Sequence, residues 1–461
     1  IEARTEQRAT ISKIAHQIFT SDETGNLLER AERENAGDEN VQALLRVVRR
    51  DFDRATKLST ELVEERTRVT SQAQDEWAKA RAQSEYSHFA PWLDRVLDIN
   101  RRVAQAYGYK NCLYDALLDE YEEGMTRAQL DPIFDELKSA IVPLLKEISP
   151  RSNQVSDEIL RREYSIDKQK QFAERVLADC GFDFARGRQD VSVHPFCTHF
   201  GRDDVRLTTR YDLHDLPSAL FGSLHEMGHG LYEQNIAPEL DGTPLGGGVS
   251  LGVHESQSRL WENLVGRSRE FWNRYYDDLK NTFPNQLNDV APEAFYRAMN
   301  KVEPSLIRVE ADEVTYNLHI ILRYEIENDL LEGKLSTEDA PAAWNAKMQE
   351  YFGITPPDDA HGILQDVHWS IGAIGYFPTY SLGNILSVQL WEAALQAHPE
   401  IPDQIARGEF STLLGWLREN VHQHGRKFPP QQLIQRATGR PLDVAPYAGY
   451  LNRKFREVYG L

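Results

Sequence analysis

One short segment, residues 221–232, constrains this chain more than any other. It contains the pentad His225-Glu226-Met227-Gly228-His229, an H-E-x-x-H pattern. On an α-helix, residues four positions apart lie on one face, one turn above the other. Two imidazoles placed in this way can bind one zinc ion, and Glu226 can then take a proton from a water molecule at that ion. The segment therefore predicts a helical metal site, and the alternative is that both histidines are ordinary core or surface residues.

The residues around the pentad favour a helix but include unexpected glycines. Asp215 is a plausible N-cap, and Pro217 is tolerated in a first turn. A glycine inside a helix is unfavourable, because it costs about 1 kcal/mol relative to alanine. Close approach of another backbone, or of a substrate, is therefore predicted at three positions: Gly222, Gly228 and Gly230.

A third metal ligand is expected downstream, because a catalytic zinc ion usually has three protein ligands and leaves one position to water. Residues 252–263 begin a second helix after a glycine-rich loop, and Glu255 lies near its start. Glu255 is the predicted ligand and His254 is its rival, while the structural alternative for Glu255 is a first-turn acid favoured by the helix dipole. Glu262, seven residues further on, shares that face and could hold a ligand imidazole. Zn²⁺ is the predicted cofactor, although Co²⁺ or Mn²⁺ could occupy the same ligands.

Composition argues against several classes of protein. The chain has 461 residues and a formal net charge of −20, which disfavours nucleic acid or an anionic membrane surface as a partner. No run of about 18 apolar residues is present, so no transmembrane helix is expected. The charged first residues do not resemble a signal peptide. Since Cys112, Cys180 and Cys197 are not in C-x-x-C spacing, a reducing cytoplasm is the expected compartment.

Most of the chain is patterned for helices. Apolar residues recur at helical spacing in five N-terminal segments: 1–30, 37–80, 92–107, 132–148 and 154–180. The second is predicted as one long helix, part of a coiled-coil-like scaffold or a lid over a cleft. Residues 204–211 alternate and are rich in β-formers, which predicts a small sheet just before the metal helix. The glycine-rich loop at 238–252 is interpreted as a mobile flap or a simple turn.

These patterns predict a mainly α-helical fold, large and two-lobed, with a small β-sheet near the metal helix. We expect residues 1–461 to form a single domain. Its helical N-terminal part would comprise residues 1–185, and its metal-site part residues 186–461.

Five further elements resemble motifs of the thermostable carboxypeptidase Taq family of metallocarboxypeptidases. They are His194-Pro195-Phe196, the D-x-R-x-T element at 204–208, His254-Glu255-Ser256, the I-R-x-x-A-D element at 307–312 and the G-x-x-Q-D-x-H-W element at 362–369. The resemblance implies a mainly α-helical peptidase that has a deep cleft and forms a homodimer. It also implies release of single residues, with broad specificity, from peptide substrates that have a free C-terminus.

The resemblance also suggests catalytic roles. His225, His229 and Glu255 would hold the metal, and Glu226 would act as general base and then pass the proton to the leaving amine. His368, together with Tyr376 or Tyr380, would stabilise the developing oxyanion. The structural alternative for either tyrosine is a core aromatic residue with a hydrogen-bonded hydroxyl.

An exopeptidase must also recognise the terminal carboxylate, for which arginine offers a matching planar fork. Arg308 and Arg426 are the predicted clamps, and Arg206 is expected to help close the far end of the cleft. A structural ion pair is the alternative for each. An oligopeptidase that cuts inside short peptides is the nearest rival function. A non-catalytic metal-stabilised scaffold is disfavoured by Glu226, because a structural site needs no base.

Overall fold

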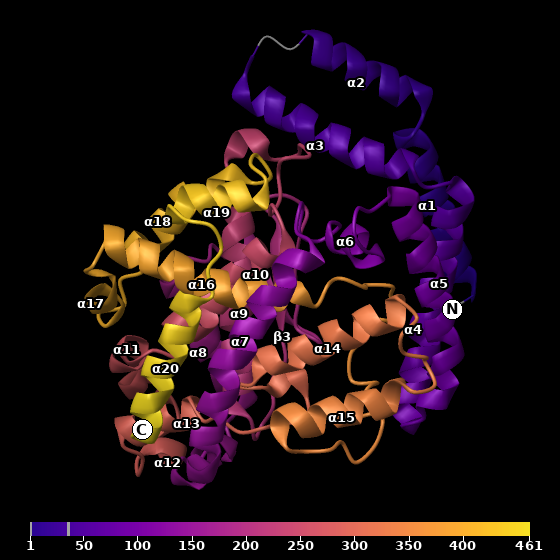
Figure 1. Cartoon of the computed structure of the whole chain (residues 1–461). Helices are drawn as coiled ribbons and strands as arrows, with labels where there is room; N and C mark the ends of the chain where they lie inside the picture. Colours follow the sequence, from indigo (N-terminus) through magenta and orange to yellow (C-terminus); the bar gives the residue numbers. More distant parts are fainter. Residues whose placement is uncertain (1, 35–36) are drawn as a thin grey trace. The chain divides into compact units, whose positions relative to one another are not determined.

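The computed structural model describes residues 2–34 and 37–461. Helices dominate these residues, as the sequence predicts, and their strands form one small sheet (Figure 1). Ile1, where the first helix was expected to begin, lies outside the described residues. None of the described helices is both long and apolar enough to cross a membrane.

Two compact units make up the chain. The first comprises Ile1–Asp135, Pro304–Ala311 and Thr315–Pro378, and the second comprises Glu136–Glu303, Asp312–Val314 and Thr379–Leu461. These limits differ from the predicted division at residue 185. The single domain, the two lobes and the deep cleft stay predictions.

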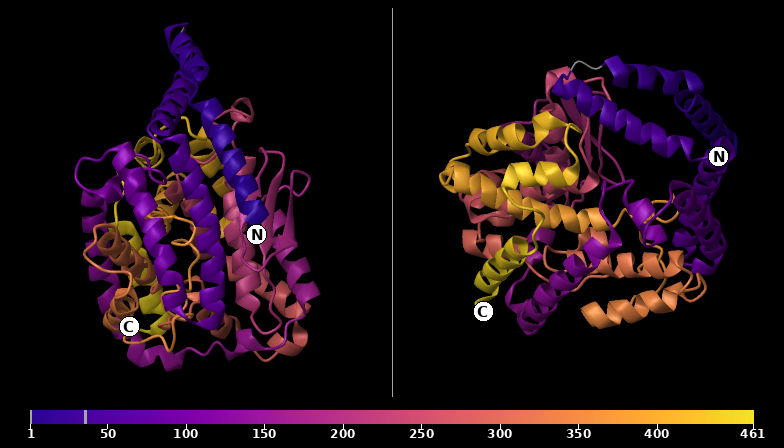
Figure 2. Two further views of the ribbon diagram at one scale, coloured as in Figure 1. Left: turned by 90° about the vertical axis from the view of Figure 1, so that its right-hand side faces the viewer. Right: turned by 45° about the horizontal axis from the view of Figure 1, so that its top comes forward.

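The first unit is built from helices that are mostly near the N-terminus. Its elements are α1 (Glu2–Phe19), α2 (Asp22–Glu34), α3 (Glu39–Thr56), α4 (Thr60–Gln83), α5 (Tyr86–Tyr107), α6 (Leu113–Leu118), the start of α7 (Arg127–Ile148), η5 (Arg308–Glu310), α14 (Tyr316–Leu331) and α15 (Ala340–Phe352). Helices α2 and α3 lie side by side in every view (Figures 1 and 2), and Gly25 of α2 packs against the ring of Phe52 in α3.

Two of the predicted N-terminal helices are each divided in the structure. The segment 37–80 contains α3 and α4 rather than one helix, because the chain turns at Lys57–Ser59. Ser59 then caps α4 by accepting a hydrogen bond from the backbone N–H of Leu62 (3.2 Å). The segment 1–30 likewise contains α1 and most of α2. Helical periodicity continues across these breaks, so the pattern alone did not show them.

The second unit carries the sheet and the pentad. Its elements are the end of α7, η1 (Ser149–Gln154), η2 (Glu158–Arg161), α8 (Ile166–Asp179), β1 (Gly187–Val191), β2 (Cys197–His199), β3 (Val205–Thr209), α9 (Leu216–Gln234), η3 (Pro238–Leu240), α10 (Leu251–Arg259), η4 (Leu260–Val265), α11 (Arg269–Thr282), α12 (Pro284–Leu287), α13 (Pro292–Met299), α16 (Pro378–Ala397), α17 (Ile401–Ile405), α18 (Ser411–Asn420), η6 (His422–His424), α19 (Pro430–Thr438) and α20 (Ala445–Tyr459). The segment 154–180 is therefore only partly α-helical, since α8 begins at Ile166.

The small sheet lies against the pentad helix, as the sequence predicts. Its strand order is β1-β3-β2, with β3 parallel to β1 and antiparallel to β2. Gly230 of α9 allows close packing on β3, because a Cβ there would lie only 2.9 Å from a methyl carbon of Leu207. Thr209 at the end of β3 donates a hydrogen bond to the carbonyl of Ala219 in α9 (3.2 Å). The sheet therefore fixes the position of α9 within this unit.

Candidate metal centre

Helices α9 and α10 bring three possible ligands together. One possible ligand atom from each of His225, His229 and Glu255 lies within 4.8 Å of the other two. The carboxylate Oε2 of Glu255 is 3.6 Å from Nε2 of His225 and 3.5 Å from Nε2 of His229. The two imidazole side chains are 20% and 17% exposed, whereas that of Glu255 is 7% exposed. The cluster is therefore largely buried, and some solvent still reaches the imidazoles.

The start of each helix agrees with the sequence-based expectation. Asp215 caps α9 by accepting a hydrogen bond from the backbone N–H of Ser218 (3.4 Å). Ser250 caps α10 in the same way at Val253 (3.2 Å). With α10 beginning at Leu251, Glu255 lies in its second turn.

Gly228 explains how the two helices approach so closely. A Cβ at this position would lie 2.5 Å from the carbonyl oxygen of Gln257 and 2.6 Å from Cα of Ser258, both in the backbone of α10. The predicted backbone contact is therefore confirmed at Gly228. At Gly222 no other backbone approaches closely, because a Cβ would make only an ordinary contact of 3.5 Å with Thr209 Oγ1; approach of a substrate there stays a prediction.

A network of charged residues orients Glu255 and His225. Arg259 donates from Nε to Oε1 of Glu255 (2.7 Å) and from Nη1 to Oε2 of Glu262 (3.2 Å). The same Glu262 oxygen lies 2.9 Å from Nδ1 of His225. Glu262 therefore makes the hydrogen bond expected from the sequence. It lies on η4, a π-helical turn, and such turns are frequent at functional sites.

The second imidazole is supported by a longer chain of contacts. Nδ1 of His229 lies 2.6 Å from Nδ1 of His254, and Nε2 of His254 lies 2.6 Å from Oε1 of Glu233. Both ring nitrogens of His254 are thus engaged, one by His229 and the other by Glu233. Sequence reasoning missed Glu233, although its position four residues after His229 placed it on the same face of α9.

The electrostatics suit a metal site that also needs a base. Burial raises the pKa of Glu226 to about 7, against the opposing effect of His225. Burial also lowers the pKa of His229 to about 4, which keeps its imidazole neutral. For Glu255, burial acts to raise the pKa, but His225, Arg259 and His229 together lower it well below its usual value. Two imidazoles and an ionised carboxylate are a donor set that fits a divalent transition metal.

Of the other predicted residues, His368, Tyr376 and Arg308 belong to the first unit. The rings of His368 and Tyr376 lie 5.2 Å apart. Arg308 is buried, and its guanidinium donates to Asp366 (2.7 Å) and to the hydroxyl of Tyr316 (2.8 Å). These contacts agree with the structural ion pair considered for Arg308.

Tyr380, Arg426 and Arg206 belong to the second unit, together with the ligand cluster. Tyr380 lies half-buried near the start of α16. Arg426 is half-buried beside the loop before α10, with its guanidinium 3.4 Å from the carbonyl of Pro244. Arg206 on β3 is exposed and makes two hydrogen bonds with Asp204 (2.8 and 2.9 Å).

Comparison with known proteins identifies the family. The family model of the carboxypeptidase Taq (M32) metallopeptidases matches residues 1–455 of this sequence. The chain belongs to the carboxypeptidase Taq (M32) family. It is 41% identical to carboxypeptidase 1 of Bacillus subtilis over 99% of this chain and 92% of that protein. Thermostable carboxypeptidase 1 of Thermus thermophilus is 42% identical over 100% of this chain and 92% of that protein.

The solved structures agree with this assignment. The crystal structure of the M32 carboxypeptidase from Deinococcus radiodurans has a TM-score of 0.96 and 44% sequence identity, and the match covers 100% of this chain and 93% of that one. The protein is thus a metallocarboxypeptidase, and peptides are its substrates. M32 membership implies a divalent metal, for which the cluster of two histidines and Glu255 is the possible site.

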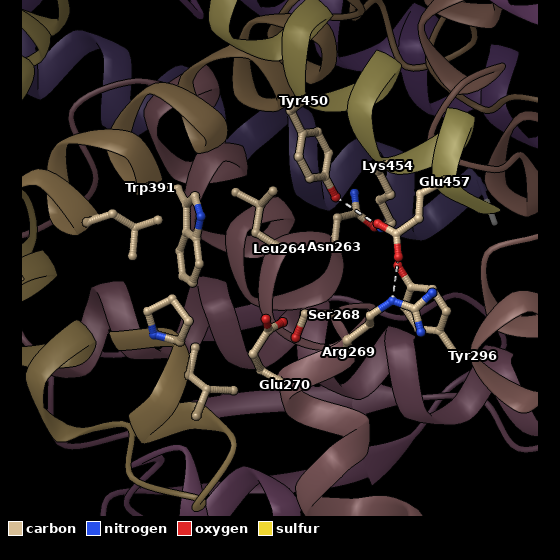
Figure 3. Close-up of a pocket in the computed structure, with 13 residues that line it drawn as sticks. Asn263, Leu264, Ser268, Arg269, Glu270, Tyr296, Trp391, Tyr450, Lys454 and Glu457 are labelled. Atoms are coloured by element: carbon tan, nitrogen blue, oxygen red, sulfur yellow. Dashed lines mark hydrogen bonds and ion pairs between the residues drawn. The ribbon is translucent and has the colours of Figure 1, made fainter. Parts of the chain in front are cut away.

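One cavity of this M32 chain is formed by residues outside the ligand cluster. A cavity of about 320 Å³ is lined by residues that include Leu264, Trp391 and Lys454, but by none of the three possible ligands (Figure 3). Its basic residues Arg269 and Lys454 are already ion-paired, Arg269 with Glu457 and Lys454 with Glu313 outside the lining. An anion would have to break these contacts, so the ligand cluster remains the candidate functional site.

In the first unit, a buried side chain forms a hydrogen bond with Trp369, the last residue of the G-x-x-Q-D-x-H-W element. Glu327 is fully buried and accepts hydrogen bonds from Trp369 Nε1 (2.9 Å) and the hydroxyl of Tyr114 (2.9 Å). Burial raises the pKa of Glu327 to about 8, although these donors oppose the shift. No pattern in the sequence pointed to this residue, because its partners are distant along the chain.

Proposed function

We propose that this metallocarboxypeptidase releases single amino acids from the free C-termini of peptides, with broad specificity for the residue removed. His225, His229 and Glu255 hold the metal in this proposal. The observation that carries it is the meeting of these three donors beside Glu226, a buried acid that no structural metal site would need.

Glu226 is the proposed general base. When bound, the metal supplies Lewis-acid chemistry, since a divalent cation lowers the pKa of a water molecule and polarises the scissile carbonyl. The Glu226 carboxylate accepts the proton of the attacking water and then donates it to the nitrogen of the leaving amine, so that the carboxylate is regenerated. A pKa near 7, raised by burial, suits both steps, because the group must accept and release a proton at neutral pH.

Arg426 is the stronger of the two candidates for binding the terminal carboxylate of the substrate. The guanidinium of Arg308 is buried and engaged with Asp366 and Tyr316, so a substrate carboxylate would have to displace an existing ion pair. Arg426 is more exposed and lies in the same unit as the ligand cluster. A role for Arg206 in closing the cleft stays a prediction.

Other parts of the proposal follow from the family resemblance. His368, with Tyr376 or Tyr380, is the predicted donor to the oxyanion. Zn²⁺ is the proposed metal because two imidazoles and a carboxylate suit it, with Co²⁺ or Mn²⁺ as substitutes. A homodimer is likewise proposed from the resemblance, and a cytoplasmic location is proposed from the few cysteines.

Product analysis tests the exopeptidase proposal. A defined peptide and its C-terminally amidated form are incubated with the enzyme, and the products are identified by mass. We expect stepwise loss of single residues from the free peptide and little cleavage of the amide. Internal fragments from both peptides would instead establish the oligopeptidase alternative.

The roles of the metal and of Glu226 are tested together. Chelation should abolish activity, and added Zn²⁺ should restore it. Glu226→Gln should bind the metal as tightly as the wild type, because the residue is not a ligand, and should lower kcat by about 10²- to 10⁴-fold. A Glu226→Gln variant that keeps its metal and most of its activity would exclude the proposed base.

A further inference from the structure

The two imidazoles of the ligand cluster are supported differently. Nδ1 of His225 contacts a carboxylate directly, at Glu262 (2.9 Å). Nδ1 of His229 instead contacts a second histidine, His254, at 2.6 Å. Behind His254, at 2.6 Å from its Nε2, lies Glu233, which is 2% exposed. The support for His229 is therefore a carboxylate–imidazole–imidazole chain that ends at a buried carboxylate.

With one proton on each ring, this chain allows only one arrangement of protons. An ionised carboxylate can accept hydrogen bonds but cannot donate them, so Nε2 of His254 must carry its proton. Nδ1 of His254 then bears a lone pair and must accept from Nδ1–H of His229. This leaves the lone pair of His229 on Nε2, the atom that lies 3.5 Å from Oε2 of Glu255.

Packing keeps the middle ring of the chain in place. A Cβ at Gly248 would lie 2.5 Å from Cδ2 of His254, so the loop before α10 closes directly over that ring. On α9, the ring of Tyr232 lies 5.0 Å from the ring of His254. His254 therefore has little freedom to turn away from His229 and Glu233.

We propose that Glu233 and His254 are positioning residues that hold His229 in the tautomer with its lone pair on Nε2. They would thereby raise the affinity of the ligand cluster for its metal. The inference rests on the proposed ligand set but concerns residues that touch neither metal nor substrate. In the other tautomer, His229 would present an N–H to the metal and could not bind it.

Three substitutions separate this role from simple packing. In Glu233→Gln the shape is kept, but an amide can donate as well as accept, so the proton arrangement is no longer enforced. His254→Asn places an oxygen near the position of Nδ1 and keeps the acceptor for His229. His254→Gln places an amide near the position of Nε2, which keeps the contact with Glu233 but loses that acceptor.

The dissociation constant for Zn²⁺ is measured by competition with a chelator, starting from metal-free enzyme. We expect Glu233→Gln and His254→Gln to bind Zn²⁺ about 10- to 100-fold more weakly, as for other residues that orient a ligand imidazole. His254→Asn should bind more tightly than His254→Gln. Ser256→Ala, on the same helix, is the control, because its hydroxyl donates to the carbonyl of Val253 (2.6 Å), away from the imidazole chain. Wild-type affinity in both Glu233→Gln and His254→Gln would overturn the proposal.

A spectroscopic measurement on the wild type tests the proposal even if the variants fail to fold. In metal-free enzyme labelled with ¹⁵N-histidine, long-range ¹H–¹⁵N spectra distinguish protonated from unprotonated ring nitrogens. We expect Nδ1 of His229 to be protonated and Nε2 to be unprotonated. The reverse pattern would refute the proposal whatever the variants do. Wild-type metal affinity in Glu226→Gln, with altered affinity in Glu233→Gln, would separate this role from the proposed catalytic one.

Discussion

Replacement of Gly228 by alanine should weaken metal binding although the residue touches no metal. A methyl group at Gly228 would meet the backbone of α10, at 2.5 Å from the carbonyl oxygen of Gln257 and 2.6 Å from Cα of Ser258. Optimal carbon–carbon contacts lie near 3.5 Å, so α9 and α10 would have to separate by about 0.9 Å at this point. Backbone atoms on both sides leave no flexible side chain to absorb the change.

This separation acts directly on the ligand cluster, because α9 carries both histidines and α10 carries Glu255. Metal–ligand distances tolerate only about 0.2 Å of error. A helix separation of about 0.9 Å should therefore lower the affinity for the metal about 10-fold or more. Overpacking should also destabilise the metal-free protein by about 1–3 kcal/mol. The better helix propensity of alanine offsets about 1 kcal/mol of this.

Gly222→Ala is a matched control on the same helix. Its Cβ would make one ordinary contact of 3.5 Å, and its gain in helix propensity is the same as at Gly228. The difference between the two variants therefore isolates the packing effect. Chelator competition gives the metal affinity, and thermal unfolding with a chelator present gives the stability of the metal-free protein. Equal affinity and equal stability in both variants would refute the reasoning.

Three further changes test other parts of the structure. Arg426→Lys should raise KM about 10-fold or more for a free peptide, because the bidentate fork is lost, and leave hydrolysis of the amidated peptide unchanged; steady-state kinetics measure both. Gly383→Ala should weaken Zn²⁺ binding in chelator competition, since its Cβ would lie 2.5 Å from Cγ of Glu255. Because the pKa of Glu327 is raised from 4.5 to about 8, the folded state holds an extra proton between these values, and stability falls as pH rises through this window. Glu327→Gln should remove this fall in the free energy of unfolding, which is on the order of 4 kcal/mol at most between pH 5 and pH 8. Unfolding midpoints of the variant and the wild type, compared at pH 5 and pH 8, measure the difference.

Some features of the fold could be predicted because their causes are local. The cap at Asp215, the strand within residues 204–211 and the second helix near Glu255 depend on neighbouring residues, and all are present. The breaks at Lys57–Ser59 and before Ile166 were missed, because helical periodicity continues across them. The ion pairs of Arg308 could not be assigned from sequence, because Asp366 is 58 positions away.

The sequence by itself determined the chemistry that the protein carries. Helical periodicity places His225 and His229 on one face of α9, and the pentad adds an acid beside the first of them. Family motifs then identify a metallocarboxypeptidase, and the comparisons confirm this.

Only the tertiary structure decided which side chains meet. His254 and Glu255 are neighbours in sequence, but successive residues on a helix point about 100° apart, so only one of them can face the two Nε2 atoms. The packing of α10 on α9 at Gly228 turns Glu255 toward these atoms and His254 toward Glu233. Residue spacing alone does not determine whether His254 or Glu255 faces the Nε2 atoms, because the answer depends on how α10 packs on α9.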